Sequence, residues 1–208
     1  MKISRPLDRI LDNEAKVKIL RFLIKTNAQW NGRQIAKEIG ITPATAHKVL
    51  HSLFEEGVLM LKNVGKTHIY SLKEDSYIVS SLLKPLFANE EMVLNSIVET
   101  IRRKIASSDI KKYISSVVIF GSVNLRLERP TSDIDLAVII KDKNKRQEVF
   151  ALFEDIDKKI SLEFGNTISP YINTESEFRI KYKNGLGIAK NIVKSNKLIF
   201  GKRIESIL

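Results

Sequence analysis

The stretch that decides the fold is residues 116–140, which read SVVIFGSVNLRLERPTSDIDLAVII. Residues 116–120 and 135–140 are apolar, β-branched runs, and Gly121 and Ser122 directly follow the first run. Runs of this kind, bounded by turn residues, are typical of buried strands. The stretch therefore predicts a strand, a tight turn, a short irregular piece and a second strand.

Two carboxylates stand one residue apart where the second strand begins. Side chains at positions i and i+2 of a strand point to the same face, so we expect Asp133 and Asp135 to share one face. Ile134 and Leu136 are then expected to turn into the core. Two close carboxylates repel each other unless a cation lies between them. Mg²⁺ (or Mn²⁺) suits this pair, because hard ions take carboxylate and phosphate oxygens as ligands.

The turn between the two strands has the properties of a phosphate site. Gly121 has no side chain, so a ligand can approach the backbone closely there. Ser122 offers a hydroxyl and a backbone N–H at the expected beginning of a short helix, the end of a helix that favours phosphate. We therefore expect Gly121 and Ser122 to favour a ligand that carries phosphate.

These residues together resemble a known signature. Gly121-Ser122, a spacer, and then Ser132 followed by D-I-D-L at 133–136 are similar to the motif of the DNA polymerase β-like nucleotidyltransferase superfamily in its minimal form. The resemblance covers roughly residues 110–205. It implies that Gly121 and Ser122 hold a nucleoside triphosphate and that Asp133 and Asp135 are catalytic and bind divalent metal. The implied reaction transfers a nucleoside monophosphate to an acceptor, with the metal ions aligning attacking and leaving oxygens.

The sequence departs from the family pattern at the third carboxylate, which the resemblance places on a neighbouring strand. The best candidate strand, 167–172, contains no acid. Glu163 is expected on a helix surface, and Glu175 and Glu177 look like acids of a helix first turn. Residues 123–126 also lack the further glycine that minimal members often carry. Whether the chain is an enzyme is therefore left open.

Length and composition limit which classes of protein and of binding site the chain can represent. With 208 residues the chain has room for two small domains, and its formal net charge of +11 suits a polyanion such as nucleic acid or a nucleotide. Zero cysteine excludes disulfides and thiolate metal sites, and three histidines disfavour a histidine-based zinc site. No apolar run approaches the roughly 20 residues of a membrane span, and the N-terminus lacks the apolar core of a secretory signal. We expect a cytoplasmic protein that makes no membrane contact.

The first part of the chain predicts three helices, over residues 12–26, 32–39 and 43–56. Gly40 is expected to stop the second helix, and Thr42 to cap the third, with Pro43 at its first position. The third helix is expected to bury one stripe, made of Ala46, Val49, Leu50, Leu53 and Phe54. Residues 58–72 then read as a strand, a turn at 63–66 and a second strand.

This order resembles a winged helix-turn-helix, a class of DNA-binding domain, over residues 8–75. The resemblance implies that the exposed face of helix 43–56 enters the major groove and that the wing reaches phosphates or the minor groove. The candidate contacts are Pro43, Ala44, Thr45, His47, Lys48 and His51 on the helix, and Lys62, Asn63, Lys66 and His68 in the wing. A role in protein interaction or dimerisation is the alternative. His47 and His51 could pair on a metal, although a polar surface stripe is the simpler interpretation.

Residues 76–109 are expected to form a helical connector. A first helix should break at Pro85, and Asn89 should cap a second one. That second helix carries an apolar stripe of Leu94, Ile97, Val98, Ile101 and Ile105. The stripe is expected either to pack against the second domain or to form a seam in a homodimer, and the sequence leaves both open.

The remaining residues predict helices over 144–164, 174–183 and 186–194, a strand over 167–172 and a short terminal strand. The expected fold class is α+β: a winged helix-turn-helix (1–75), a helical connector (76–109) and a mixed-sheet nucleotidyltransferase-fold domain (110–208). The leading functional hypothesis is a DNA-binding regulator whose second domain binds nucleoside triphosphate and Mg²⁺.

The alternative hypothesis is an active transferase that uses the winged helix for docking. It would modify a protein or RNA acceptor, as do the minimal nucleotidyltransferase antitoxins that modify a partner toxin. A purely structural adaptor is a third hypothesis, and the paired Asp133 and Asp135 argue against it, since nothing structural needs two neighbouring carboxylates.

Overall fold

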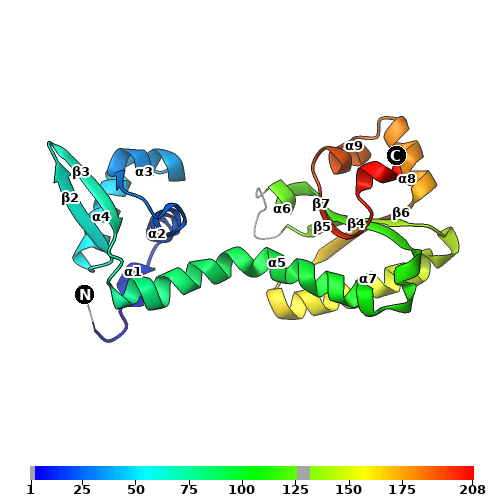
Figure 1. The fold of residues 1–208 in the computed structure, drawn as a ribbon, viewed down its shortest axis with the longest axis horizontal. Helices are drawn as coiled ribbons and strands as arrows, with labels where there is room; N and C mark the ends of the chain where they lie inside the picture. The colour runs from blue at the N-terminus through cyan, green and yellow to red at the C-terminus, as the bar shows by residue number, and fades with distance from the viewer. Residues whose placement is uncertain (1–2, 126–131) are drawn as a thin grey trace. The chain divides into compact units, whose positions relative to one another are not determined.

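The computed structural model describes residues 3–125 and 132–208. It divides into two compact units, Met1–Met92 and Val93–Leu208, and the division falls within helix α5 (Lys84–Ser107) (Figure 1). The irregular piece predicted around 126–131 lies outside the described residues. None of the described helices is long and apolar enough to cross a membrane. The division of the chain at residues 75 and 109 stays a prediction.

The first unit begins with four helices whose ends follow local signals. They are α1 (Leu7–Ile10), α2 (Glu14–Thr26), α3 (Gly32–Ile39) and α4 (Pro43–Glu55). Gly40 ends α3 in the left-handed conformation, with φ of 70°. Thr42 caps α4 by accepting a hydrogen bond from the Thr45 N–H at 3.1 Å. The predicted helix-turn-helix is confirmed.

A small antiparallel sheet completes this unit. It has the order β1-β3-β2 and consists of β1 (Trp30–Asn31), β2 (Leu59–Val64) and β3 (Thr67–Leu72). The β2–β3 hairpin turns through Gly65, which has φ of 59°. The hairpin is the predicted wing. The two residues of β1 were not predicted, because a strand this short has no periodicity to read.

One prediction about the core of the first unit is wrong. Ala46, Val49, Leu50 and Leu53 of α4 are buried as expected, but Phe54 is 40% exposed. Glu56 is buried at this end of the helix instead, and its Oε1 lies 3.6 Å from Nη1 of Arg9. The chain leaves the helix at Gly57, so the packed stripe ends with Leu53.

The central helix also differs from the prediction. A π-helical segment, η1 (Ile78–Leu83), continues directly into α5. The predicted break at Pro85 and the predicted cap at Asn89 are therefore wrong. A π-helical turn is wider than an α-helical turn and bonds residues five apart, so the Pro85 ring is accommodated without an N–H at that position.

The second unit is built on a mixed four-stranded sheet of order β6-β5-β4-β7. The strands are β4 (Ile114–Ile119), β5 (Ile134–Ile140), β6 (Ile168–Thr174) and β7 (Lys197–Gly201). β4 is antiparallel to both of its neighbours, whereas β5 and β6 are parallel. The crossover between the parallel strands is helix α7 (Arg146–Phe164). The predicted α+β fold with a mixed sheet is confirmed.

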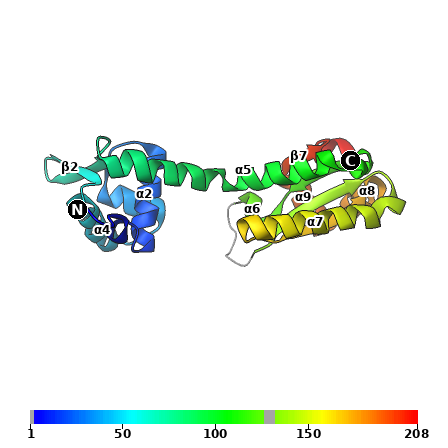
Figure 2. The same ribbon diagram turned by 90° about the horizontal axis from the view of Figure 1, so that it is seen from below.

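Helices cover both faces of this sheet (Figure 1). The C-terminal part of α5 and α7 lie on one face, and α8 (Glu175–Lys183) and α9 (Gly187–Lys194) lie on the other. Figures 1 and 2 show α5 and α7 running along the same side, where Lys104 and Asp155 form an ion pair at 2.7 Å. Four residues of the predicted α5 stripe are buried in this core: Ile97, Val98, Ile101 and Ile105. These four positions therefore pack against the second domain, the first of the two expected roles of the stripe, and Leu94 is partly buried beside them.

Two glycines of the second unit test how tightly its sheet is packed. Gly201 has φ of 81°, and a Cβ added there would overlap the carbonyl oxygen of Ser115 on β4. Gly165, which ends α7, has φ of 75° and open space around it. We expect Gly165→Ala to cost about 1 kcal/mol from backbone strain. Gly201→Ala should cost clearly more, because the strand pair must separate.

Urea denaturation of both variants, followed by circular dichroism, measures this difference. Equal losses of unfolding free energy for Gly201→Ala and Gly165→Ala would contradict the close approach of Gly201 to Ser115.

Candidate functional site

The turn after β4 brings Gly121 into direct contact with Asp135. Gly121 opens the short helix α6 (Gly121–Leu125) with φ of 75°, and a Cβ at this position would overlap Oδ2 of Asp135. The two strands are joined beside this contact, where the Phe120 N–H donates to the Asp135 carbonyl at 3.1 Å. Only glycine fits both the left-handed backbone and the space next to the carboxylate.

The two aspartates lie at the beginning of β5 in different surroundings. Asp133 is exposed and its Oδ1 accepts a hydrogen bond from the Thr167 hydroxyl, while Asp135 is half-buried. Ile134 and Leu136 are buried on the other face of the sheet, as predicted. Burial, and secondarily the negative charge of Asp133, raise the pKa of the Asp135 carboxyl above its usual value. A cation between the two carboxylates would relieve this repulsion, so the pair fits a divalent metal.

The neighbouring strand supplies hydroxyls where a third carboxylate would complete the site. In the parallel β5–β6 register, Asp135 lies opposite Ser169, and paired residues of adjacent strands share a face. Thr167 precedes β6 and bonds Asp133. Within residues 3–125 and 132–208, no group of three His, Cys, Asp or Glu side chains is placed to hold a metal ion. Sequence reasoning named this strand but missed Ser169, because only the register identifies it.

Asp157 of α7 accepts a hydrogen bond of 2.7 Å from the Ile168 N–H at the beginning of β6. The three acids that the sequence analysis considered have partners of their own. Glu163 forms a surface ion pair with Lys159 at 3.5 Å, and Glu175 accepts a hydrogen bond from Ser115. Glu177 belongs to the capping box of α8 and pairs with Arg146. These contacts agree with the interpretation of all three as structural acids.

Ser122 lies half-buried on α6, directly after Gly121. α6 is tied to the region before β7 by a hydrogen bond of 2.8 Å from Asn124 Nδ2 to the Ser195 hydroxyl. The structure thus brings Gly121, Ser122, Asp133 and Asp135 to one end of the central strand pair.

The candidate DNA contacts of the first unit all lie on its surface. Every one of the following side chains is exposed: Pro43, Ala44, Thr45, His47, Lys48, His51, Lys62, Asn63, Lys66 and His68. His51 Nδ1 lies 3.6 Å from Glu55 Oε1, so this histidine faces a carboxylate along the helix. His47 and His51 belong to no metal-binding group among the described residues.

A cleft of about 450 Å³ lies between α4, which is the predicted recognition helix, and the wing. Four candidate DNA contacts line it: Pro43, His47, Lys66 and His68. The sequence analysis did not name the other lining residues, which are Asn31, Gly32, Arg33, Thr67 and Tyr70. They come from β1, α3 and β3, so their proximity to α4 depends on tertiary packing and has no local sequence signal.

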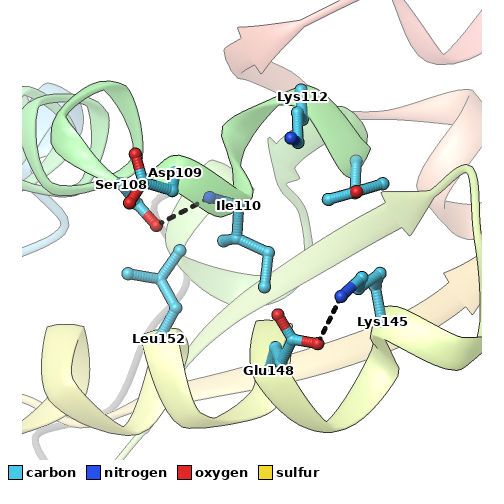
Figure 3. A pocket seen from close by; sticks show the side chains of 8 residues that line it. Ser108, Asp109, Ile110, Lys112, Lys145, Glu148 and Leu152 are labelled. Atoms are coloured by element: carbon cyan, nitrogen blue, oxygen red, sulfur yellow. Dashed lines mark hydrogen bonds and ion pairs between the residues drawn. The ribbon is translucent and has the colours of Figure 1, made fainter.

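Figure 3 shows a second cleft, of about 490 Å³, with Asp109 and Glu148 among the side chains that line it. Its first lining residues precede β4, whereas Gly121 follows β4, so the cleft lies at the opposite end of the β4–β5 pair from Gly121. It is formed by the residues before β4 and the beginning of α7. Its side chains carry both signs of charge, and Lys145 pairs with Glu148 at 2.7 Å across its edge. This mixture gives it no selectivity for one class of ion.

Two family models match separate parts of the chain. Residues 103–205 match the family model described as polymerase beta, nucleotidyltransferase, and residues 17–60 match the model of the IclR helix-turn-helix domain. A search of curated proteins gives no significant match.

Solved structures resemble parts of the chain. The transcriptional repressor BigR from Xylella fastidiosa is 19% identical over 40% of this chain and 81% of its own, with a TM-score of 0.35. The spectinomycin adenyltransferase AAD(9) from Enterococcus faecialis, with ATP and spectinomycin, is 20% identical over 57% of this chain and 59% of its own, with a TM-score of 0.40. A toxin–antitoxin with AMP-PNP is 15% identical over 51% of this chain and 79% of its own, with a TM-score of 0.33.

The raised pKa of Asp135 predicts a stabilising substitution. Its folded pKa lies above the unfolded one, so ionisation disfavours the folded state, and this cost appears as the pH rises through the folded pKa. Asp135→Asn should therefore raise the melting temperature at pH 7 in the presence of a chelator. The gain should shrink as the pH falls through the folded pKa, where the native carboxyl becomes protonated, and should be absent below the ordinary pKa of an aspartate.

Asp155→Asn is the matched control with the opposite sign. A hydrogen bond from Lys104 and its charge lower the pKa of Asp155, so this substitution should lower the melting temperature at pH 7. Differential scanning fluorimetry across pH measures both variants. A lower melting temperature for Asp135→Asn at pH 7 would contradict the unfavourable surroundings of this carboxylate.

Proposed function

Because the chain joins a winged helix-turn-helix DNA-binding domain to a polymerase β-like nucleotidyltransferase-fold domain, we propose that it is a DNA-binding regulator whose second domain binds a nucleoside triphosphate with Mg²⁺. Mn²⁺ would serve the same oxygen ligands. The regulator would act in the cytoplasm, where its DNA and nucleotides occur together.

The observation that carries the nucleotide proposal is the contact between Gly121 and the Asp135 carboxylate, with Asp133 exposed beside it. Asp133 and Asp135 would hold the metal ion, whose charge would neutralise the phosphates when bound. Gly121 leaves room for a phosphate to approach the backbone. The Ser122 hydroxyl and N–H would donate hydrogen bonds to phosphate oxygens.

The position opposite Asp135 favours binding over transfer. Ser169 offers a neutral hydroxyl there, which is a weak metal ligand and a weak base beside a carboxylate. The site would therefore bind the nucleotide as a signal and transfer it slowly or not at all. The alternative is an active enzyme. It would transfer a nucleoside monophosphate to a protein or RNA acceptor, and the winged helix would dock that acceptor.

The surface of the first unit supports the DNA proposal. The recognition helix presents Thr45, His47 and Lys48 to solvent on one face. Glu56, which would repel phosphates at the end of this helix, is buried beside Arg9. A homodimer would place two recognition helices on a two-fold DNA site.

The nucleotide site predicts a metal-dependent affinity that needs both aspartates. In calorimetric titrations the parent should bind ATP or another triphosphate with Mg²⁺. Asp133→Asn and Asp135→Asn should each weaken binding about tenfold or more, a loss of at least ~1.4 kcal/mol. Glu163→Gln removes a surface carboxylate paired with Lys159 and should leave the affinity unchanged. Binding that is absent from the parent, or that is equal in all four proteins, refutes the proposed site.

A regulator further predicts that the nucleotide changes DNA affinity. Fluorescence anisotropy should be measured on DNA from the region upstream of the gene that encodes this chain. The logarithm of the association constant should fall linearly with the logarithm of the salt concentration. Adding the triphosphate with Mg²⁺ should shift the affinity severalfold in the parent and not in Asp135→Asn.

The same samples decide between sensing and transfer. A labelled nucleotide should remain free after incubation with Mg²⁺. Incorporation into protein or RNA by the parent, lost in Asp133→Asn, would identify an enzyme instead of a sensor.

A further inference from the structure

The cleft between the recognition helix and the wing carries charge of one sign. Its lining includes Arg33 from α3, His47 from α4, and Lys66 and His68 from the wing, and it includes no carboxylate. Arg33 and Lys66 form no ion pair within the described part of the chain, and both are exposed. The second cleft differs, because both lysines and acids line it. An anion is the class of ligand that such a concave surface favours.

Tyr70 provides a second, independent indication of a ligand. Only 3% of this residue is exposed, it lines the cleft, and its hydroxyl makes no hydrogen bond to the described residues. This hydroxyl is not among the fully buried side-chain atoms that lack a partner, so it reaches the surface of the cleft, where it can donate a hydrogen bond to a ligand. Burial raises the pKa of the Tyr70 phenol, which keeps the hydroxyl protonated and able to donate.

Two further polar residues, Asn31 and Thr67, line the cleft. Asn31 uses its Oδ1 to accept a hydrogen bond of 2.9 Å from the Gln34 N–H in the cap of α3. The Asn31 amide nitrogen and the Thr67 hydroxyl are still able to donate. The lining thus offers donors and cations together, which is the complement of a tetrahedral oxyanion.

We propose that this cleft is a phosphate pocket, with Arg33 and Tyr70 as its principal ligands, and that a phosphate of the DNA backbone occupies it. The assignment to DNA rests on the proposed function, whereas the affinity for phosphate does not. A phosphate held between α4 and the β2–β3 hairpin fixes how the recognition helix enters the groove, because backbone contacts set orientation and register. A free phosphate group would use the same pocket and compete with DNA.

DNA titrations of the full chain test the two new residues against matched controls. Arg33→Gln should weaken binding about tenfold for specific and unrelated DNA alike, and should reduce the salt slope by roughly 1. Tyr70→Phe should weaken binding about fivefold through the loss of one hydrogen bond to a charged group, with the salt slope unchanged. Lys37→Gln removes a cation from the other end of α3, and Tyr77→Phe alters a tyrosine that is 73% exposed. Both controls should stay within twofold of the parent.

Competition by inorganic phosphate separates a pocket from a diffuse positive surface. At equal ionic strength, phosphate should displace DNA more effectively than chloride does, and this excess should vanish in Arg33→Gln and Tyr70→Phe. The proposal is overturned if phosphate and chloride displace DNA equally well. It is also overturned if Arg33→Gln and Lys37→Gln lose the same amount of DNA affinity.

A direct titration covers the case in which the parent binds no DNA. That result would refute the proposed DNA role but not the pocket. Inorganic phosphate should then still shift the imidazole NMR signals of His47 and His68 saturably, and Tyr70→Phe should abolish the saturation. Such shifts would support the pocket with a free phosphate group as its ligand, and their absence would refute it.

Discussion

The Asp135 carboxylate occupies the space that a side chain at residue 121 would need. This close approach requires a glycine with positive φ at the end of β4, and it requires β4 and β5 to pair in one register. The same register directs Leu136 into the core and Asp135 to the opposite face. A shift by one residue would exchange these two faces and place a carboxylate among apolar side chains. The site and the packing of the sheet are therefore fixed by one constraint.

Local signals account for the parts of the fold that the sequence predicted well. Gly40, Thr42 and Pro43 mark the boundary between α3 and α4, because capping and left-handed backbone are decided within a few residues. The two strands around Gly121 were also predicted, since each strand and the turn carry their own pattern.

Two features that the sequence did not predict depend on residues far apart in the chain. Ser169 was missed because only the parallel β5–β6 register places it opposite Asp135. The cleft was missed because Arg33, His47 and Tyr70 come from three different elements. Both result from packing or register, which periodicity within one segment does not encode. Pro85 was misread for a local reason. A preceding π-helical segment changes the geometry that normally makes proline a helix breaker.

The two proposed sites recognise the same chemistry by opposite means. The cleft of the first unit offers cations and donors directly to phosphate, whereas Asp133 and Asp135 repel phosphate until a divalent ion lies between them. The first site therefore depends on salt and the second on metal concentration, so the two respond to different signals. Any coupling between them is reciprocal: a nucleotide that weakens DNA binding must itself be bound more weakly by the DNA-bound chain. Because α5 runs unbroken across the boundary of the two units, it is the covalent element through which such a coupling would act.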